Sequence, residues 1–176
     1  MRGAGDSSAA GAAVVALAAE VHRLLKDRGQ TVGTAESLTG GSLAAALTAV
    51  PGASASYVGG VVSYATAVKE AVLRVPGALI SAEGVISAAC AEAMADGCRE
   101  LLGSDFALAT TGVAGPTEQE GRPVGTVYVG LASSARTVSV GLHLTGDRAV
   151  IVASTCVAAL RLLAEALGDF PPSQGR

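Results

Sequence analysis

The chain has 176 residues, of which 50% are hydrophobic and 3% aromatic, with no tryptophan and a formal net charge of −3. This length suits one domain, and a core made of Ala, Val, Leu and Ile is typical of helices packed on a buried sheet. Because the charge is negative and the basic residues are scattered, the composition argues against a nucleic-acid-binding surface.

Helices and strands are expected to alternate along the first two thirds of the chain. In order, we expect a helix at 14–28, a strand at 31–35, a helix at 39–50, a strand at 57–63, a helix at 66–74, a helix at 87–102 and a strand at 105–110. Ser87 is placed to cap the N-terminus of its helix, and Gly29 and Gly103 follow helix ends, as C-cap glycines do.

The last third of the chain predicts a hairpin and a long helix. Strands at 125–132 and 136–144 are followed by a helix at 147–167. The pattern indicates an α/β fold, a three-layer sandwich with a mostly parallel sheet, a C-terminal antiparallel hairpin and helices on both faces. We expect one domain at 13–170, a flexible leader at 1–12 and a flexible tail at 171–176.

Several classes of protein are disfavoured by absent patterns. No uninterrupted apolar run approaches the ~20 residues of a membrane span, and no signal-like segment is evident, so we expect a cytoplasmic protein. The three cysteines contain no CxxC pair, which suits free thiols in a reducing compartment. His22 and His143 lie far apart and belong to no metal-binding cluster, so we expect neither a metal ion nor another cofactor.

The unusual segments of the sequence are expected to meet at one edge of the sheet. In open α/β sheets, ligands bind beyond the carboxyl ends of the parallel strands. The expected topology brings to that edge residues 36–41, 64–69, 111–116, 123–125 and 146–148. We therefore expect the functional site there.

Ser37 lies between a strand end and a helix start, which leaves two interpretations open. Serine at such a junction most often caps the helix. Alternatively, Ser37 is a nucleophile, and the backbone N–H groups freed by Gly40 and Gly41 form an oxyanion or phosphate site at the helix N-terminus. The segment is not GxSxG, so the α/β-hydrolase arrangement does not apply.

A base for Ser37 would have to come from the same edge. The chain has twelve basic Lys and Arg residues, of which only Lys26 and Lys69 are lysines. A desolvated lysine can lose its proton and an arginine cannot, so Lys69 is a candidate base. The alternative is a solvated helix residue paired with an acid such as Glu70. Tyr64 either packs in the core or relays or holds a proton.

Arg148 and the segment 111–116 suggest an anionic ligand. Residues 111–116 resemble an anion-cradling loop. Arg148 starts a helix, where a positive charge opposes the helix dipole. A bound anion would explain its position, whereas Asp147 suits the helix start on structural grounds.

Five segments, taken together and in this order, resemble the C-terminal domain of the competence/damage-inducible protein CinA, a family of nicotinamide mononucleotide deamidases. The resemblance covers residues 14–168. It implies a metal-free amidohydrolase that converts nicotinamide mononucleotide to nicotinate mononucleotide and ammonia. The segments are AESLTGG at 35–41, PGASASYVGGVVSYATAVK at 51–69, TGVAGP at 111–116, PVGTVYVG at 123–130 and GDR at 146–148.

The resemblance also implies roles for individual residues. Ser37 would be the nucleophile and Lys69 the base, with Tyr64 assisting. The expected partner is a mononucleotide substrate, and we expect the protein to bind neither nucleic acid nor a membrane. We allow for a homo-oligomer, either a dimer or a larger assembly. The residues expected to bind the substrate are Thr39, Gly40, Gly41, Thr111, Gly112, Ala114, Gly115 and Arg148.

The chain departs from the family pattern in two places. Residues 117–122 are acidic where the family is usually glycine-rich, and Val152 stands where a second basic residue often follows the GDR arginine. Both departures bear on substrate affinity or phosphate contacts more than on the Ser–Lys pair. The alternatives to an amidohydrolase are a non-catalytic nucleotide-binding module and a competence-associated regulatory role, and the charge balance disfavours a role in DNA uptake.

Overall fold

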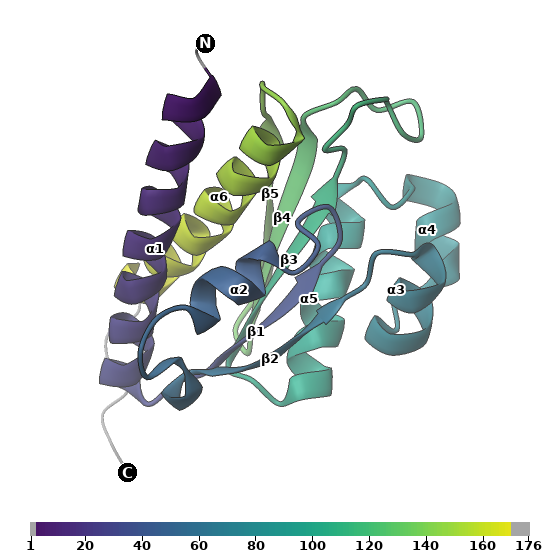
Figure 1. Ribbon diagram of the computed structural model, residues 1–176. Coiled ribbons are helices and arrows are strands. Elements are labelled where there is room, and N and C mark those ends of the chain that lie inside the picture. The colour runs from purple at the N-terminus through teal and green to yellow at the C-terminus, as the bar shows by residue number, and fades with distance from the viewer. Residues whose placement is uncertain (1–2, 170–176) are drawn as a thin grey trace.

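A five-stranded mixed sheet lies at the centre of the fold in the computed structural model, which describes residues 3–169 (Figure 1). The spatial order is β2-β1-β3-β4-β5. β2, β1 and β3 are parallel, and β4 is antiparallel to both of its neighbours. Only β4 therefore runs against the common direction, as predicted for a sheet that ends in a hairpin. The strands are β1 (Val32–Glu36), β2 (Tyr57–Val62), β3 (Phe106–Gly112), β4 (Thr126–Ser133) and β5 (Thr137–His143).

Helices cover both faces of the sheet and enclose two apolar cores (Figure 1). On one face lie α1 (Gly3–Arg28), α2 (Ser42–Thr48) and α6 (Arg148–Asp169). On the other lie α3 (Thr66–Leu73), α4 (Gly77–Glu83) and α5 (Ala88–Leu102). A short 3-10 turn, η1 (Ala53–Ala55), precedes β2. The predicted α/β fold with helices on both faces is confirmed.

Local signals in the sequence explain most of the element boundaries. The Ser87 hydroxyl accepts a hydrogen bond from the Cys90 N–H at 3.1 Å and caps α5, which ends at Gly103 with φ 62°. The whole of β1 is buried, and so is β3 up to its last residue. This burial is typical of strands in a sheet that is covered on both sides.

The boundaries differ from expectation at three places. α1 begins at Gly3, so residues 3–12 of the expected leader are helical. α2 starts at Ser42, since residues 38–41 form a turn. α4 was not predicted, because seven residues after Pro76 are too few to show a helical period and no side chain caps them. Met1, Arg2 and the expected tail at 171–176 lie outside the described residues.

The helix α6 is long and apolar enough to cross a membrane by length and composition, because residues 148–168 have a mean hydropathy of 1.9. The sequence analysis did not expect such a run. In the fold, α6 packs against α1 and the sheet. Its residues Ile151, Leu160 and Leu163 are fully buried. Its composition is therefore explained by its place in the core.

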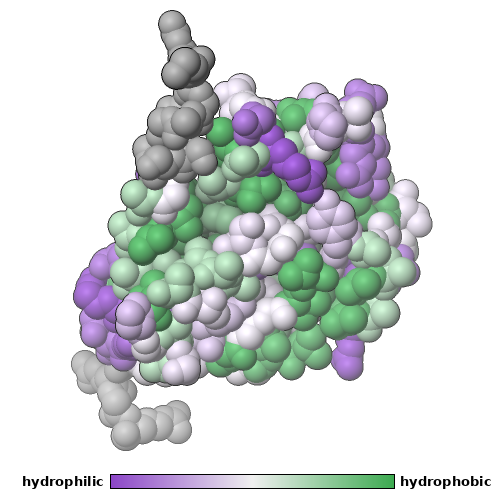
Figure 2. All heavy atoms as spheres, in the orientation of Figure 1, coloured by the Kyte–Doolittle hydropathy of each residue, from purple (hydrophilic) through white to green (hydrophobic). Residues whose placement is uncertain are grey.

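β2 forms an outer edge of the sheet, since it pairs only with β1. Figure 2 shows hydrophobic residues gathered at the lower right of the visible face, over the end of β2 and over α3. The exposed apolar residues of these two elements are Val58, Val62 and Val72. This edge is thus apolar as well as unpaired.

Gly97 lets α5 approach the end of α3. A Cβ added at this position would lie in hard contact with the carbonyl oxygen of Leu73. Because overpacking of this kind costs about 1–3 kcal/mol, we predict that Gly97→Ala lowers the melting temperature followed by circular dichroism. Gly168→Ala is the control, since nothing lies within 4 Å of its added Cβ. Equal melting temperatures for the two variants would contradict the close packing.

Candidate active site

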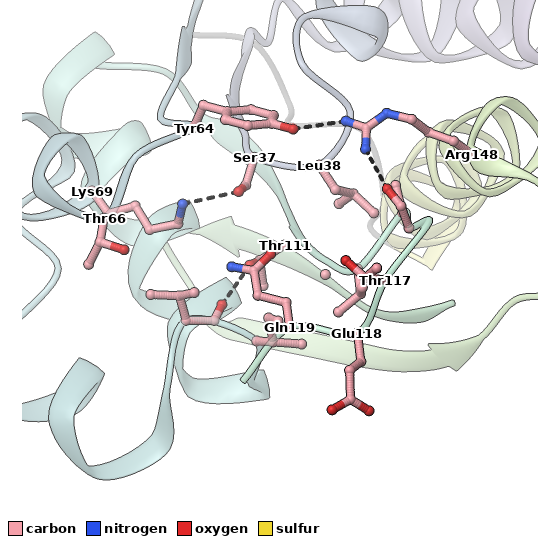
Figure 3. A pocket seen from close by; sticks show the side chains of 16 residues that line it. Ser37, Leu38, Tyr64, Thr66, Lys69, Thr111, Thr117, Glu118, Gln119 and Arg148 are labelled. Carbon is pink, nitrogen blue, oxygen red and sulfur yellow. Dashed lines mark hydrogen bonds between the residues drawn. The ribbon is translucent and has the colours of Figure 1, made fainter. Parts of the chain in front are cut away.

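A cavity of about 300 Å³ lies at the carboxyl ends of the parallel strands (Figure 3). Segments that are distant in the sequence meet there, because β1, β2 and β3 all end at this edge. The lining residues are Ser37, Leu38, Tyr64, Thr66, Lys69, Val85, Ile86, Thr111, Gly112, Val113, Ala114, Gly115, Thr117, Glu118, Gln119 and Arg148.

The amine of Lys69 points at the hydroxyl of Ser37 (Figure 3). Lys69 Nζ lies 3.0 Å from Ser37 Oγ and donates a second hydrogen bond to the carbonyl oxygen of Ser63 at 2.6 Å. The lysine is only 1% exposed. Within the part of the chain whose side chains are described, it makes no ion pair. The alternative interpretation of Lys69, as a solvated helix residue paired with an acid such as Glu70, is therefore wrong.

Burial lowers the pKa of Lys69 below its usual value of 10.5. The Glu120 carboxylate, and Cys90 when it is a thiolate, raise the pKa of Lys69 by smaller amounts. A lowered pKa increases the fraction of neutral amine, which is the form that can accept a proton. Burial raises the pKa of Cys90 to about 11, so this neighbour stays a neutral thiol at physiological pH.

Glu36, which sequence reasoning missed, fixes the backbone on which Ser37 sits. Its carboxylate is 1% exposed. It accepts hydrogen bonds from the N–H groups of Gly41, Leu43 and Ala44 at 2.8 to 3.0 Å. These are orphan donors at the start of α2. The Ser37 N–H in turn donates to the carbonyl oxygen of Thr110 at 2.9 Å, which ties the same segment to β3.

The N-terminus of α2 is thus occupied by a carboxylate of the protein itself. Gly41 is the N-cap residue, and the Glu36 side chain accepts the N–H groups at this helix start, so the interpretation of Ser37 as an N-cap is wrong. Thr39, Gly40 and Gly41 do not line the cavity. The Gly41 N–H donates to Glu36, and the Thr39 hydroxyl is hydrogen-bonded to that of Thr110 at 2.7 Å. The expected anion site at this helix start is therefore not available.

Leu38 and Gly115 offer backbone donors in its place. Both residues line the cavity. Neither N–H group donates a hydrogen bond to another residue between 3 and 169. Leu38 directly follows Ser37, and Gly115 lies in the loop after β3. Such donors can stabilise negative charge that develops on a bound ligand.

Tyr64 and Arg148 lie together at the cavity, where Figure 3 shows the hydroxyl facing the guanidinium. Arg148 Nη2 donates to Tyr64 Oη at 2.8 Å, and Arg148 Nη1 donates to the Gly115 carbonyl oxygen at 2.9 Å. Tyr64 is 58% exposed, so it is not a core residue. Its hydroxyl contacts Arg148 rather than Ser37 or Lys69. The exposed guanidinium remains accessible to an anion.

The remaining predicted residues, Thr111, Gly112, Ala114 and Gly115, all line the cavity. The Thr111 hydroxyl is buried and donates to the carbonyl oxygen of Val85 at 2.6 Å, so it holds the cavity wall. No group of three or more His, Cys, Asp or Glu side chains in the described residues could hold a metal ion. His22 is buried elsewhere, bonded to Ser56 Oγ and Leu47 O.

The family model for the CinA C-terminal domain matches residues 14–167. The chain belongs to the CinA C-terminal domain family. A CinA-like protein of Frankia casuarinae is 50% identical over 151 residues, which cover 86% of this chain and 35% of that protein. A CinA-like protein of Geobacter metallireducens is 45% identical over 141 residues, which cover 80% of this chain and 34% of that protein. The chain thus spans about a third of the length of these curated relatives.

Solved structures of the CinA superfamily share the fold. The competence damage-inducible protein A (ComA) from Klebsiella pneumoniae is 38% identical, with a TM-score of 0.87 over 90% of this chain and 99% of that chain. The competence/damage inducible protein CihA from Agrobacterium tumefaciens is 31% identical, with a TM-score of 0.85 and coverage of 89% and 96%. The family and fold expected from the sequence are confirmed.

We predict that Glu36→Gln destabilises the protein, because an amide presents one acceptor oxygen and no charge to the three N–H groups. Hydrogen bonds to charged groups contribute about 1.5–3 kcal/mol each, so the free energy of unfolding in urea should fall by at least ~1.5 kcal/mol. Glu165→Gln, an exposed position on α6, is the matched control. The capping role is wrong if both variants unfold at the same urea concentration.

Proposed function

We propose that this protein hydrolyses the carboxamide of nicotinamide mononucleotide to nicotinate mononucleotide and ammonia, with Ser37 as nucleophile and Lys69 as base. The observation that carries the proposal is the 3.0 Å contact between Lys69 Nζ and Ser37 Oγ, made by a lysine that is 1% exposed. The substrate is taken from the family resemblance of the sequence. We also propose that the protein acts in the cytoplasm, which suits its three free, buried cysteines.

In the first step, neutral Lys69 accepts the hydroxyl proton of Ser37 while Ser37 Oγ bonds to the carboxamide carbon. A neutral amine has two N–H donors and one lone pair. One donor can stay on the Ser63 carbonyl oxygen while the lone pair takes the proton. The carbonyl π electrons move to oxygen, and we assign the stabilisation of this oxyanion to the N–H groups of Leu38 and Gly115.

In the second step, the oxyanion re-forms the carbonyl and the C–N bond breaks. The Lys69 ammonium returns its proton to the leaving nitrogen, so ammonia departs and an ester remains on Ser37. Water then attacks the ester carbon, and Lys69 again accepts a proton. Collapse of this second intermediate releases nicotinate mononucleotide and restores the Ser37 hydroxyl.

Arg148 is the candidate partner for the substrate phosphate. Its guanidinium is exposed at the cavity and is fixed by Gly115 and Tyr64. A guanidinium suits this task because it stays protonated and presents several donors to phosphate oxygens. We accordingly assign Tyr64 to orienting Arg148, instead of the proton transfer expected from the sequence.

Ser37→Ala, Lys69→Ala and Lys69→Arg should each lower ammonia release from nicotinamide mononucleotide by ~10³-fold or more. The alanine variants lack the nucleophile or the base, and the guanidinium of Lys69→Arg keeps its proton. Because the two residues act as one unit, the double alanine variant should be little worse than either single variant. Substantial turnover by Lys69→Arg would show that Lys69 supplies only positive charge.

Calorimetry of the Ser37→Ala variant separates catalysis from binding. The variant should bind nicotinamide mononucleotide as tightly as the parent protein, because the proposed phosphate partner is intact. A parent protein that binds the nucleotide but releases no ammonia would instead be the non-catalytic nucleotide-binding module.

The pH dependence of kcat/KM should report the lowered pKa of Lys69. Only the neutral amine accepts the Ser37 proton, so activity rises as pH rises through the pKa of Lys69. Because burial lowers that pKa from 10.5, the rise should level off below pH 10.5. Ammonia release measured from pH 6 to 11 tests this. A rate that still climbs at pH 10.5 would mean that the base is not desolvated.

A further inference from the structure

Glu120 links the loop at 117–122 to the cavity wall. Its Oε2 accepts a hydrogen bond from the Val85 N–H at 3.0 Å. The Val85 carbonyl oxygen accepts a hydrogen bond from Thr111 Oγ1 at 2.6 Å. Both backbone polar groups of Val85 are therefore held, one by the loop and the other by the end of β3.

Val85 and Ile86 form an apolar part of the wall of the cavity that Lys69 also lines. They are 5% and 1% exposed. They belong to the short connection between α4, which ends at Glu83, and Ser87, which caps α5. The bonds from Glu120 and Thr111 hold this connection together with the Ser87 hydroxyl, which donates to the Gly84 carbonyl oxygen at 3.0 Å, and with the packing of Val85 and Ile86 in the core under α5.

The backbone has a positive φ on both sides of the hydrogen bond between Glu120 and Val85. Gly84 has φ 76°, and a Cβ added there would lie 2.7 Å from Glu120 Oε2. Glu120 itself has φ 53°, a left-handed conformation that residues with a Cβ rarely adopt. Gln119 and Arg122 pair their backbones around it. The Glu120 side chain thus leaves a tight turn, in which Glu120 and Gly121 both have positive φ, and reaches the Val85 N–H.

The charge of Glu120 raises the pKa of Lys69, although the two side chains form no ion pair. Glu120 makes no ion pair with a cation among the residues whose side chains are described. The Glu120 carboxylate raises the pKa of Lys69 against the effect of burial, and Cys90 does so only when it is a thiolate. The acceptor oxygen and the charge of Glu120 are thus separate properties that different substitutions can remove.

We infer that Glu120 is a positioning residue, whose carboxylate fastens the loop at 117–122 to Val85 and keeps the apolar wall closed beside Lys69. Its effect on rate rests on the proposed Ser37–Lys69 chemistry, whereas the contact itself can be tested without any activity. The acidic loop, which the sequence analysis connected with substrate affinity, then serves to shield the base.

Hydrogen exchange at the Val85 amide, measured by NMR on the whole chain, tests the contact. Glu120→Ala removes the acceptor and should speed exchange by at least about tenfold. Glu120→Gln keeps an acceptor oxygen and should exchange nearly as slowly as the parent. Glu83→Gln removes the same charge close by, outside the cavity lining, and should have no effect. Unchanged Val85 exchange in Glu120→Ala overturns the inference.

Kinetics of ammonia release then test the consequence for Lys69. Glu120→Ala should lower kcat by about tenfold, and Glu120→Gln should restore most of it. The rising limb of the Glu120→Gln pH profile should move to lower pH, because the carboxylate that raises the pKa of Lys69 is gone. A Glu120→Gln variant as slow as Glu120→Ala, or a limb that does not move, counts against the positioning role. If the parent protein releases no ammonia, the proposed function is refuted but the role of Glu120 is not. Hydrogen exchange at the Val85 amide then still tests whether Glu120 holds Val85.

Discussion

Burial of the Lys69 amine without a carboxylate partner is the constraint around which the site is arranged. Burial disfavours the charged amine, and among residues 3–169 its hydrogen-bond partners are the Ser63 carbonyl oxygen and the Ser37 hydroxyl. Both partners lie at the ends of neighbouring parallel strands, where the Ser63 N–H donates to the Glu36 carbonyl oxygen at 2.8 Å. The pairing of β1 with β2 therefore fixes the relative positions of the two groups that the amine contacts.

The second buried charge of the region, Glu36, is kept away from this amine. Successive side chains of a strand point to opposite faces, so Glu36 is directed to the start of α2 while Ser37 faces the cavity. The carboxylate is satisfied by three N–H groups of α2. Had Glu36 paired with Lys69, the positive form would be favoured and the amine would be a poor base. Strand alternation thus keeps apart two charges that lie close together in the fold.

Periodicity and topology could predict the sheet, the edge at which the cavity lies and the meeting of Ser37 with Lys69, because these follow from strand direction and helix length. They could not predict α4, which is too short for a period. The anion site expected at Gly40 and Gly41 failed because Glu36 takes the helix donors, and no spacing rule identifies a carboxylate placed six residues before the helix. The bonds that Thr111 and Glu120 make to Val85 are equally invisible in sequence, since they join segments that only the tertiary fold brings together.

The cavity also joins the two cores of the fold. Arg148 begins a helix of 22 residues whose apolar side packs with α1, whereas Val85 and Ile86 belong to the core under α5. The hydrogen bonds from Arg148 to Tyr64 and Gly115 cross between these layers at the sheet edge. A ligand that reaches from Arg148 to Ser37 therefore spans both layers. Repacking either core would move the Arg148 guanidinium relative to the Ser37 hydroxyl, so the geometry of the cavity depends on residues far from it.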